Sequence, residues 1–358
     1  MALSVVTNIP SPYRDEVFRE LQERTGARIY LLAEDEPGRH WAGRQLPYDH
    51  TRPPAFSFRG PRPRGEDELR PSYIPIPTWL ARRGYILVAG FGVPAILTAL
   101  CRPRSTLIWS PEATVDSEQW GWLRQRVRKW LVGRSCACVS GGDTSRRYLA
   151  QLGAREILTF PNVAGTSRGR TDFADHPTST SEDLVIVHVG DWSRRKGADI
   201  TTQVFHRLSH HYQHANFRVT LLIVGTVRNV PIPAGASHLG YLPREILWAT
   251  LRARSAKFLV LMSRSDRWPF VIAEAMAAGI IPIASPVGSA IELLAPICSH
   301  LVVSSAREAV RTIVHLHDHD EIFARIRESV VADAESRTSA WAVRTFCSEL
   351  TALDRRLA

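Results

Sequence analysis

The chain has 358 residues, 44% of them hydrophobic and 22% charged, which indicates a folded protein of about two domains and excludes a disordered or fibrous chain. Lysine and arginine outnumber aspartate and glutamate by 45 to 35, a net charge of +10. Five scattered cysteines predict reduced thiols rather than a disulfide framework. We expect a cytoplasmic protein, because the chain opens without a signal-peptide pattern and contains no apolar run near the ~18 residues of a membrane span.

The first half of the chain alternates short apolar runs with amphipathic segments. The apolar runs predict strands at 3–7, 29–32, 85–89, 106–109 and 137–140. This alternation indicates βαβ units around a parallel sheet. Between Glu34 and Pro77 it is interrupted by nine prolines, which predicts a long functional loop.

A polar segment at 163–182 predicts a linker, after which the alternation restarts with runs at 184–189, 218–224, 257–261 and 280–284. The sequence therefore predicts an α/β protein with two Rossmann-like domains and a cleft between them. Their expected ranges are 1–162 and 183–340. A C-terminal helix at 341–358 is expected to pack back on the first domain. Ligands of such sheets bind beyond the carboxyl ends of the strands.

The clearest chemical motif lies in the second half, where Asp266 precedes a turn and Glu274 follows eight residues later within a predicted helix. Pro269 suits the first turn of that helix, whose free N–H groups and dipole favour a diphosphate. Because proline has no N–H, Phe270 and Val271 are the candidate donors. Glu274 lies among apolar residues, so we expect a ligand to contact its carboxylate.

Cations for such an anion are predicted in the turn after the first strand of the second half. There Gly190 is followed by Arg194, Arg195, Lys196 and Gly197. The chain has only three lysines, and a compact ammonium acts as a point charge on phosphate oxygens. An ordinary surface turn is the alternative, and the acidic block at 266–274 favours the ligand site.

Together these segments resemble the retaining GT-B glycosyltransferases of the family-4 type. The second-half pattern consists of Gly190, Lys196-Gly197, the acid-x7-Glu-Ala-Met-Ala-Ala-Gly block and Pro286-Val287-Gly288. Three first-half segments follow in the order that this family has, namely Trp109-Ser-Pro-Glu112, Val139-Ser-Gly-Gly142 and Pro161-Asn162-Val163. The resemblance covers nearly the whole chain, and its second-half block is the specific part.

The resemblance implies a role for each of four residues. Glu274 would hold the ribose hydroxyls of a nucleotide-sugar, Asp266 a hydroxyl of the transferred sugar, and Lys196 the diphosphate, with Leu242 beside the base. As a group, Lys196, Asp266 and Glu274 are the expected catalytic residues.

Two positions depart from the family pattern. The family usually has arginine where Asp191 stands, so Arg194 or Arg195 would supply that charge. It usually has glutamate at the position of Asp266, so the sugar that fits could differ.

The implied activity is retaining, metal-independent transfer of a sugar from a nucleoside-diphosphate sugar, with UDP-sugar slightly favoured and no resident cofactor. The resemblance also implies that the C-terminal domain binds the nucleotide-sugar and the N-terminal domain the acceptor. The acceptor would be lipid-linked, a polysaccharide precursor or a small-molecule scaffold, and Tyr13, Arg14 and Glu112 are the candidate acceptor or cleft residues. Alternatives are a sugar-nucleotide epimerase of the same fold and a basic nucleic-acid-binding protein. Dispersed basic residues interrupted by acids argue against the nucleic-acid reading.

Three further patterns have two readings each. Residues 118–134 predict either peripheral contact with the inner membrane surface or a helix that covers the first sheet. One helical face would hold Trp120, Leu123, Val127, Trp130 and Leu131, with Arg124, Arg126, Arg128 and Lys129 around it. The histidines 206, 210 and 214 could chelate zinc but predict an exposed helix face. Asp318-His-Asp320 could bind a metal but predicts a helix cap.

Overall fold

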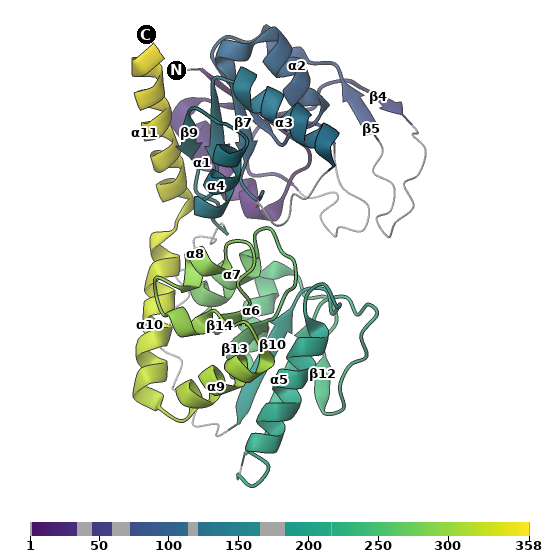
Figure 1. Cartoon of the computed structure of the whole chain (residues 1–358), viewed down its shortest axis with the longest axis vertical. Coiled ribbons are helices and arrows are strands. Elements are labelled where there is room, and N and C mark those ends of the chain that lie inside the picture. The colour runs from purple at the N-terminus through teal and green to yellow at the C-terminus, as the bar shows by residue number, and fades with distance from the viewer. Residues whose placement is uncertain are drawn as a thin grey trace. The chain divides into compact units, whose positions relative to one another are not determined.

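The computed structural model describes residues 2–33, 45–58, 72–113, 121–164, 183–215 and 217–357. Most of the predicted linker 163–182 and much of the loop 34–77 lie outside these residues. The chain forms two compact units. Unit 1 is Met1–Ser167 together with Thr338–Ala358, and unit 2 is Arg168–Arg337 (Figure 1).

Unit 1 contains the predicted parallel sheet, with seven strands in the order β3-β2-β1-β6-β7-β8-β9. The strands are β1 (Leu3–Thr7), β2 (Arg28–Leu31), β3 (His50–Thr51), β6 (Tyr85–Ala89), β7 (Thr106–Ser110), β8 (Ala137–Ser140) and β9 (Ile157–Thr159). An antiparallel pair, β4 (Ala55–Phe58) and β5 (Ser72–Pro75), occupies part of the segment predicted as a loop.

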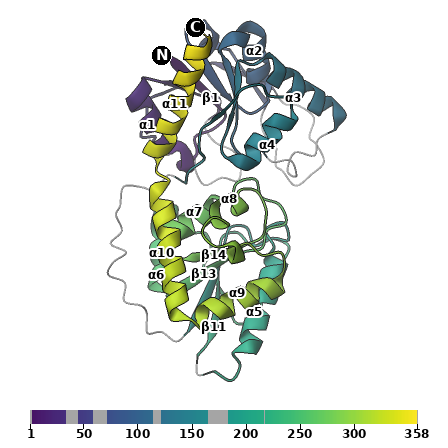
Figure 2. The same cartoon turned by 60° about the vertical axis from the view of Figure 1, so that its left-hand side comes forward.

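Helices cover both faces of this sheet, because nearly every strand residue is buried and requires an apolar cover on each side. The α-helices of unit 1 are α1 (Asp15–Thr25), α2 (Val93–Cys101), α3 (Trp122–Arg134), α4 (Asp143–Gln151) and α11 (Ser339–Leu357). One core lies between the sheet, α1 and α11, and a second lies on the side of α2, α3 and α4 (Figure 2). Short 3₁₀ helices are η1 (Pro12–Arg14), η2 (Thr78–Ala81) and η3 (Pro103–Ser105).

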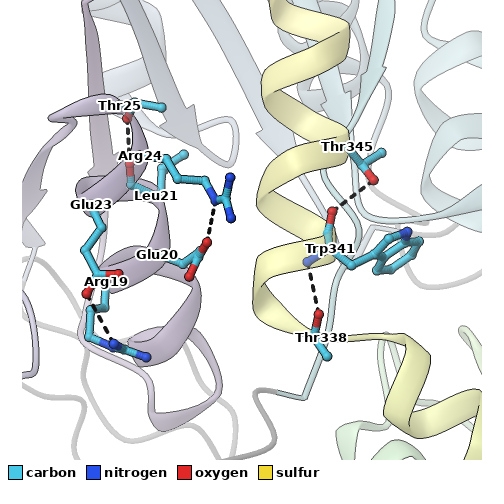
Figure 3. Close-up of polar contacts among 9 residues, drawn as sticks. All are labelled: Arg19, Glu20, Leu21, Glu23, Arg24, Thr25, Thr338, Trp341 and Thr345. Carbon is cyan, nitrogen blue, oxygen red and sulfur yellow. Dashed lines mark hydrogen bonds and ion pairs between the residues drawn. The ribbon is translucent and has the colours of Figure 1, made fainter.

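The C-terminal helix packs on unit 1, as predicted. Phe346 of α11 stacks on Phe160 with ring centroids 4.5 Å apart. Close to where α11 begins, the N–H of Trp341 donates to Thr338 Oγ1 at 3.1 Å. Figure 3 shows this cap beside α1, which contacts α11.

Unit 2 repeats the architecture with a five-stranded parallel sheet in the order β12-β11-β10-β13-β14. Its strands are β10 (Leu184–Val189), β11 (Val219–Val224), β12 (Ala236–His238), β13 (Ala256–Leu261) and β14 (Ile281–Ala284). Its helices are α5 (Ala198–His211), α6 (Arg244–Ala253), α7 (Phe270–Ala277), α8 (Ala290–Leu294), α9 (Ala306–His317), α10 (Asp320–Ser336) and the 3₁₀ turn η5 (Ser299–Leu301). None of the helices in the described part of the chain is long and apolar enough to cross a bilayer.

Because all strands of each sheet are parallel, their carboxyl ends meet at one edge. In unit 2 the loops after β10, β12, β13 and β14 share this edge, and the predicted donor residues lie on these loops or in α7, which follows the loop after β13. The fold therefore collects residues that are far apart in the sequence.

Candidate functional site

Gly197 brings the loops after β10 and β13 into contact. Its φ is +75°, which is a left-handed conformation that favours glycine, and a Cβ added there would lie 1.8 Å from the carbonyl oxygen of Met262. Beside this contact the N–H of Arg264 donates to the carbonyl of Arg195 at 2.9 Å. The two loops therefore lie backbone against backbone, and only glycine permits that approach.

The contact places Lys196 against Asp266, although 70 residues separate them in the chain. Lys196 Nζ donates to Asp266 Oδ2, and the two side chains retain only 18% and 12% of their exposure. Arg195 Nη1 donates to the neighbouring carbonyl of Ser265 at 3.3 Å. The structure thus joins two of the three residues that the sequence singled out as catalytic.

A second glycine, Gly288, contacts the backbone of the loop that carries Asp266. Gly288 has a φ of +55°, and a Cβ there would lie 2.4 Å from the carbonyl oxygen of Arg267 and 2.6 Å from that of Asp266. The loop after β14 therefore fixes the backbone that carries the acid. This explains why Pro286-Val287-Gly288 belongs to the motif.

Glu274 lies on α7 and is 6% exposed. Its carboxylate forms an ion pair with Arg244 of α6, with Nε and Oε1 2.7 Å apart. Burial raises the pKa of Glu274, and the charge of Arg244 and the indole of Trp248 oppose that effect. The carboxylate is therefore held in a desolvated setting by one cation.

Arg244 was not predicted. It is the first residue of α6, at the positive end of the helix dipole, where a cation is unfavourable without an anionic partner. A basic residue in that position is a sequence signal for such a partner. The signal does not say which acid is the partner.

The start of α7 provides one backbone donor of the two predicted. The N–H of Phe270 already donates to the carbonyl of Trp268 at 2.9 Å. Among the described backbone groups, no acceptor is assigned to the N–H of Val271. Val271 is therefore the candidate amide at this helix start.

The loop after β10 contains two cations whose side chains are exposed, Arg194 and Arg195. Gly190 turns the chain at the end of the strand with a φ of +127°. At Asp191, where the resemblance led us to expect arginine, the carboxylate faces Arg228 Nε of the loop after β11 at 3.8 Å. Arg228 was not predicted and brings a further cation to this edge.

Arg264 is another cation that the sequence did not single out. Its Nη1 and Nη2 donate hydrogen bonds of 2.6 and 2.7 Å to the two carboxylate oxygens of Asp199, at the start of α5. It also donates to the carbonyl of Arg194 at 2.7 Å.

Leu242, the predicted neighbour of the base, is half-buried against the core beneath α6.

His188 is fully buried near the end of β10. Its Nε2 lies 3.3 Å from the carbonyl oxygen of Asp191, and its ring is nearly perpendicular to that of Trp192, with the two ring centroids 4.9 Å apart. Burial lowers its pKa to about 4, hydrogen bonds to the backbone oppose this, and the charge of Lys196 adds to it. A histidine inside an apolar strand looks like an ordinary core position, so the sequence did not identify it.

In unit 1, two of the three predicted acceptor residues meet at the carboxyl edge of the sheet. Arg14 Nη2 bonds Glu112 Oε1 at 3.0 Å, and its guanidinium lies 4.5 Å from the ring centre of Trp109. Trp109 in turn stacks on Phe160. Tyr13 is in the same 3₁₀ turn as Arg14 and is half-buried.

The described residues contain no cluster of three or more histidine, cysteine, aspartate or glutamate side chains arranged to hold a metal. The exposed histidines 206, 210 and 214 lie on or just after α5, and Asp318 caps α9, as the sequence predicted.

Comparison with known proteins gives three findings. Residues 170–321 match the family described as glycosyl transferases group 1. No curated protein sequence matches the chain. Among solved structures, HepE of Anabaena in complex with UDP shares 15% identity at a TM-score of 0.68, covering 98% of this chain and 100% of that one.

Two further structures have the same fold. Sucrose-phosphate synthase of Thermosynechococcus elongatus is 14% identical at a TM-score of 0.65 and covers 100% of this chain and 99% of its own. The lipopolysaccharide outer core galactosyltransferase WaaB is 12% identical at a TM-score of 0.66, and the match covers 98% of this chain and 99% of that one. The chain therefore has the GT-B fold of two Rossmann-like units, and its second unit is similar in sequence to the group 1 glycosyl transferases.

Proposed function

We propose that this protein is a metal-independent, retaining glycosyltransferase that takes a sugar from a nucleoside diphosphate. The observation that carries the proposal is the contact of Lys196 with Asp266 beside the start of α7. An ammonium, a carboxylate and a free helix amide at one sheet edge suit a sugar joined to a diphosphate.

Each residue has a role in this proposal. Lys196 contacts the diphosphate, together with the amide of Val271 and one of the exposed cations Arg194 and Arg195. Asp266 accepts a hydrogen bond from a hydroxyl of the transferred sugar. Before the donor binds, Lys196 and Asp266 neutralise each other, which keeps the ammonium in place at a largely buried position.

Glu274 accepts hydrogen bonds from the ribose hydroxyls, and Arg244 keeps the Glu274 carboxylate charged and oriented. The raised pKa of Glu274 reflects the cost of burying that charge, and a ribose diol would offset it with two donors. UDP is the favoured nucleotide because HepE was solved with UDP and, in another structure, with UDP-glucose.

The chemistry proposed is departure of the nucleoside diphosphate while the acceptor hydroxyl enters on the same face of the sugar. The C–O bond to the leaving phosphate breaks, the acceptor oxygen forms the new bond, and its proton passes to the departing phosphate oxygen. Lys196 and the helix start stabilise the negative charge that develops on the leaving group. The rest of the rate acceleration comes from holding the two substrates in the reactive orientation.

The acceptor is proposed to be anionic or lipid-linked. Residues 1–162 contain 23 basic and 16 acidic residues, and Arg14 lies at the carboxyl edge of the unit 1 sheet. A small-molecule scaffold is the alternative acceptor.

Helix α3 supports a peripheral position at an anionic membrane surface. Trp122 is 72% exposed, Leu123 61% and Trp130 41%, whereas only Leu131 and Val132 of this helix are buried. Five basic residues and no acidic ones accompany these apolar side chains between Trp122 and Arg134. Such a helix binds bilayers through its apolar side chains and through anionic headgroups. Trp120, part of the predicted face, lies outside the described residues.

Vesicle co-sedimentation tests the position at the membrane. We expect the protein to sediment with vesicles containing anionic lipid but not with neutral ones, and Trp122→Ser/Trp130→Ser to abolish the difference. If the variant sediments as the wild type does, α3 is not the contact.

Thermal unfolding with nucleoside diphosphates tests the donor site. UDP at about 100 times its dissociation constant should stabilise the protein by about 2.7 kcal/mol. Lys196→Ala and Glu274→Ala should lose that stabilisation, whereas Lys129→Ala, which removes an exposed lysine of α3, should keep it. Unchanged shifts in both site variants would place the nucleotide elsewhere, and stabilisation by DNA alone would favour the nucleic-acid-binding alternative.

Product analysis tests the reaction. Sugar nucleotides should be hydrolysed slowly in the absence of acceptor, with the anomeric configuration retained and with no loss of rate in a chelator. Release of an inverted sugar, or conversion of the donor to its epimer without release, would overturn the proposed chemistry.

A further inference from the structure

Unit 2 has a groove between α5 and α9, which pack against each other. The groove has a volume of about 850 Å³, within the range of small-ligand sites. Most of its lining side chains are cationic or can become so: from α5 His206, Arg207, His210 and His211, and from α9 and the following turn Arg307, Arg311, His315 and His319. Two valines, Val310 and Val314, form the floor.

The charges in this groove are unbalanced. Asp318 is the one acid in the lining, and it already accepts a hydrogen bond from Tyr212 Oη at 2.7 Å. Arg207, Arg307 and Arg311 form no ion pair with any described residue. The carboxyl edge of the unit 2 sheet, which holds Lys196, Asp266 and Glu274 and is called the donor edge below, is different. There Lys196, Arg244 and Arg264 each have a carboxylate partner.

The groove is separate from the donor edge. α5 begins at Ala198, directly after the donor loop, and His206 lies eight residues further on, about 12 Å along the helix axis. His210 and His211 form the last turn of α5, and His315 is in the last turn of α9.

We infer that the groove between α5 and α9 binds a soluble ligand with several phosphate or sulfate groups. Three arginines without acidic partners offer forked donors that match phosphate oxygens, and the N–H groups of the neighbouring histidine rings are further donors. Concavity favours a small ligand over a bilayer, because the groove exposes no large apolar side chain of the kind found on α3. A metal ion is not favoured, since the described residues form no metal-ligating cluster. This inference does not depend on the proposed transfer reaction.

Calorimetric titration with inorganic tripolyphosphate tests the site. The full-length Lys196→Ala variant is the starting protein, so that binding at the donor edge is weakened. Adding Arg307→Gln/Arg311→Gln should reduce the affinity at least about tenfold. The matched control, Arg254→Gln/Arg325→Gln, removes two exposed arginines elsewhere in unit 2 and should bind as the starting protein does.

The role of the histidines is tested with inositol hexasulfate at pH 6. His210→Ala/His315→Ala should weaken its binding at least about threefold, because two ring donors are lost. Equal losses in the groove variant and its matched control would indicate attraction by overall charge only. That result, or the absence of binding by either probe at pH 6, would overturn the inference.

Discussion

Acidification should destabilise this protein through His188. The ring is fully buried, and its pKa falls from 6.5 to about 4 in the folded state. The folded protein therefore binds a proton at His188 less readily than the unfolded chain does. The difference of about 2.5 in pKa, at 1.36 kcal/mol for each, corresponds to about 3 kcal/mol of stability.

The direction follows from the lowered pKa. His188 contributes its full stability above about pH 6.5, where it is neutral in both states, and loses that contribution progressively as the pH falls toward 4. The structure identifies the cause as the removal of the ring from water, with the charge of Lys196 acting in the same direction. Protonation would place a cation among Trp192 and the core of unit 2.

Urea unfolding followed by tryptophan fluorescence at pH steps between 4.5 and 7.5 measures the effect. The comparison is between pH slopes, because His188→Gln also changes the packing and so the stability at every pH. The variant should lose most of the wild-type slope in this window, and His206→Gln, an exposed histidine of α5, should keep it. Parallel curves for wild type and His188→Gln would refute this reasoning.

Three further predictions concern the sites. Gly197→Ala should lower the free energy of unfolding in urea by at least about 2 kcal/mol and abolish stabilisation by UDP, because the new Cβ would meet the backbone of Met262. The control Gly153→Ala, where φ is +89° and the space is open, should cost only about 1 kcal/mol. Glu274→Gln should gain stability relative to wild type as the pH rises above about 4.5, because the raised pKa makes wild-type stability fall there; a constant difference across pH would contradict this. Arg14→Ala should reduce transfer to acceptor while leaving donor hydrolysis intact, and equal losses in both rates would move Arg14 out of acceptor binding.

The sequence predicted the sheets well because their strands are buried on both faces. Runs such as Leu184–Val189 are almost wholly buried in the structure, so an apolar run bounded by glycine was a sufficient signal. The C-terminal helix was also predicted and confirmed on unit 1. The pair β4 and β5 was not, because the segment 34–77 in which the two strands lie is rich in proline and resembles a loop.

Periodicity was less informative for α3. It placed Trp120, Leu123, Val127, Trp130 and Leu131 on one face, but an apolar stripe does not say whether it faces a sheet or solvent. In the structure Leu131 is buried together with Val132, whereas Leu123, Val127 and Trp130 are exposed, so the predicted face is divided. Only the position of the helix on the sheet distinguishes these outcomes, and that position is a tertiary property.

At the donor edge, the residues predicted from spacing were those fixed by the backbone. Lys196 meets Asp266 because Gly197 and Gly288 allow three loops to approach more closely than any side chain would permit. Glycine at these positions is visible in the sequence. Arg244 reaches Glu274 through side chains alone, so no turn or glycine announces the pair.

The two kinds of contact should respond differently to substitution. A backbone contact is lost when any Cβ is added, whereas a pair of side chains can be exchanged for another pair that satisfies the same buried charge. Swapping the charges in Arg244→Glu/Glu274→Arg should therefore restore stability relative to either single variant, while the double change should still fail to bind UDP, because the ribose hydroxyls would meet a guanidinium. Recovery of UDP binding would show that Glu274 serves the fold and not the nucleotide.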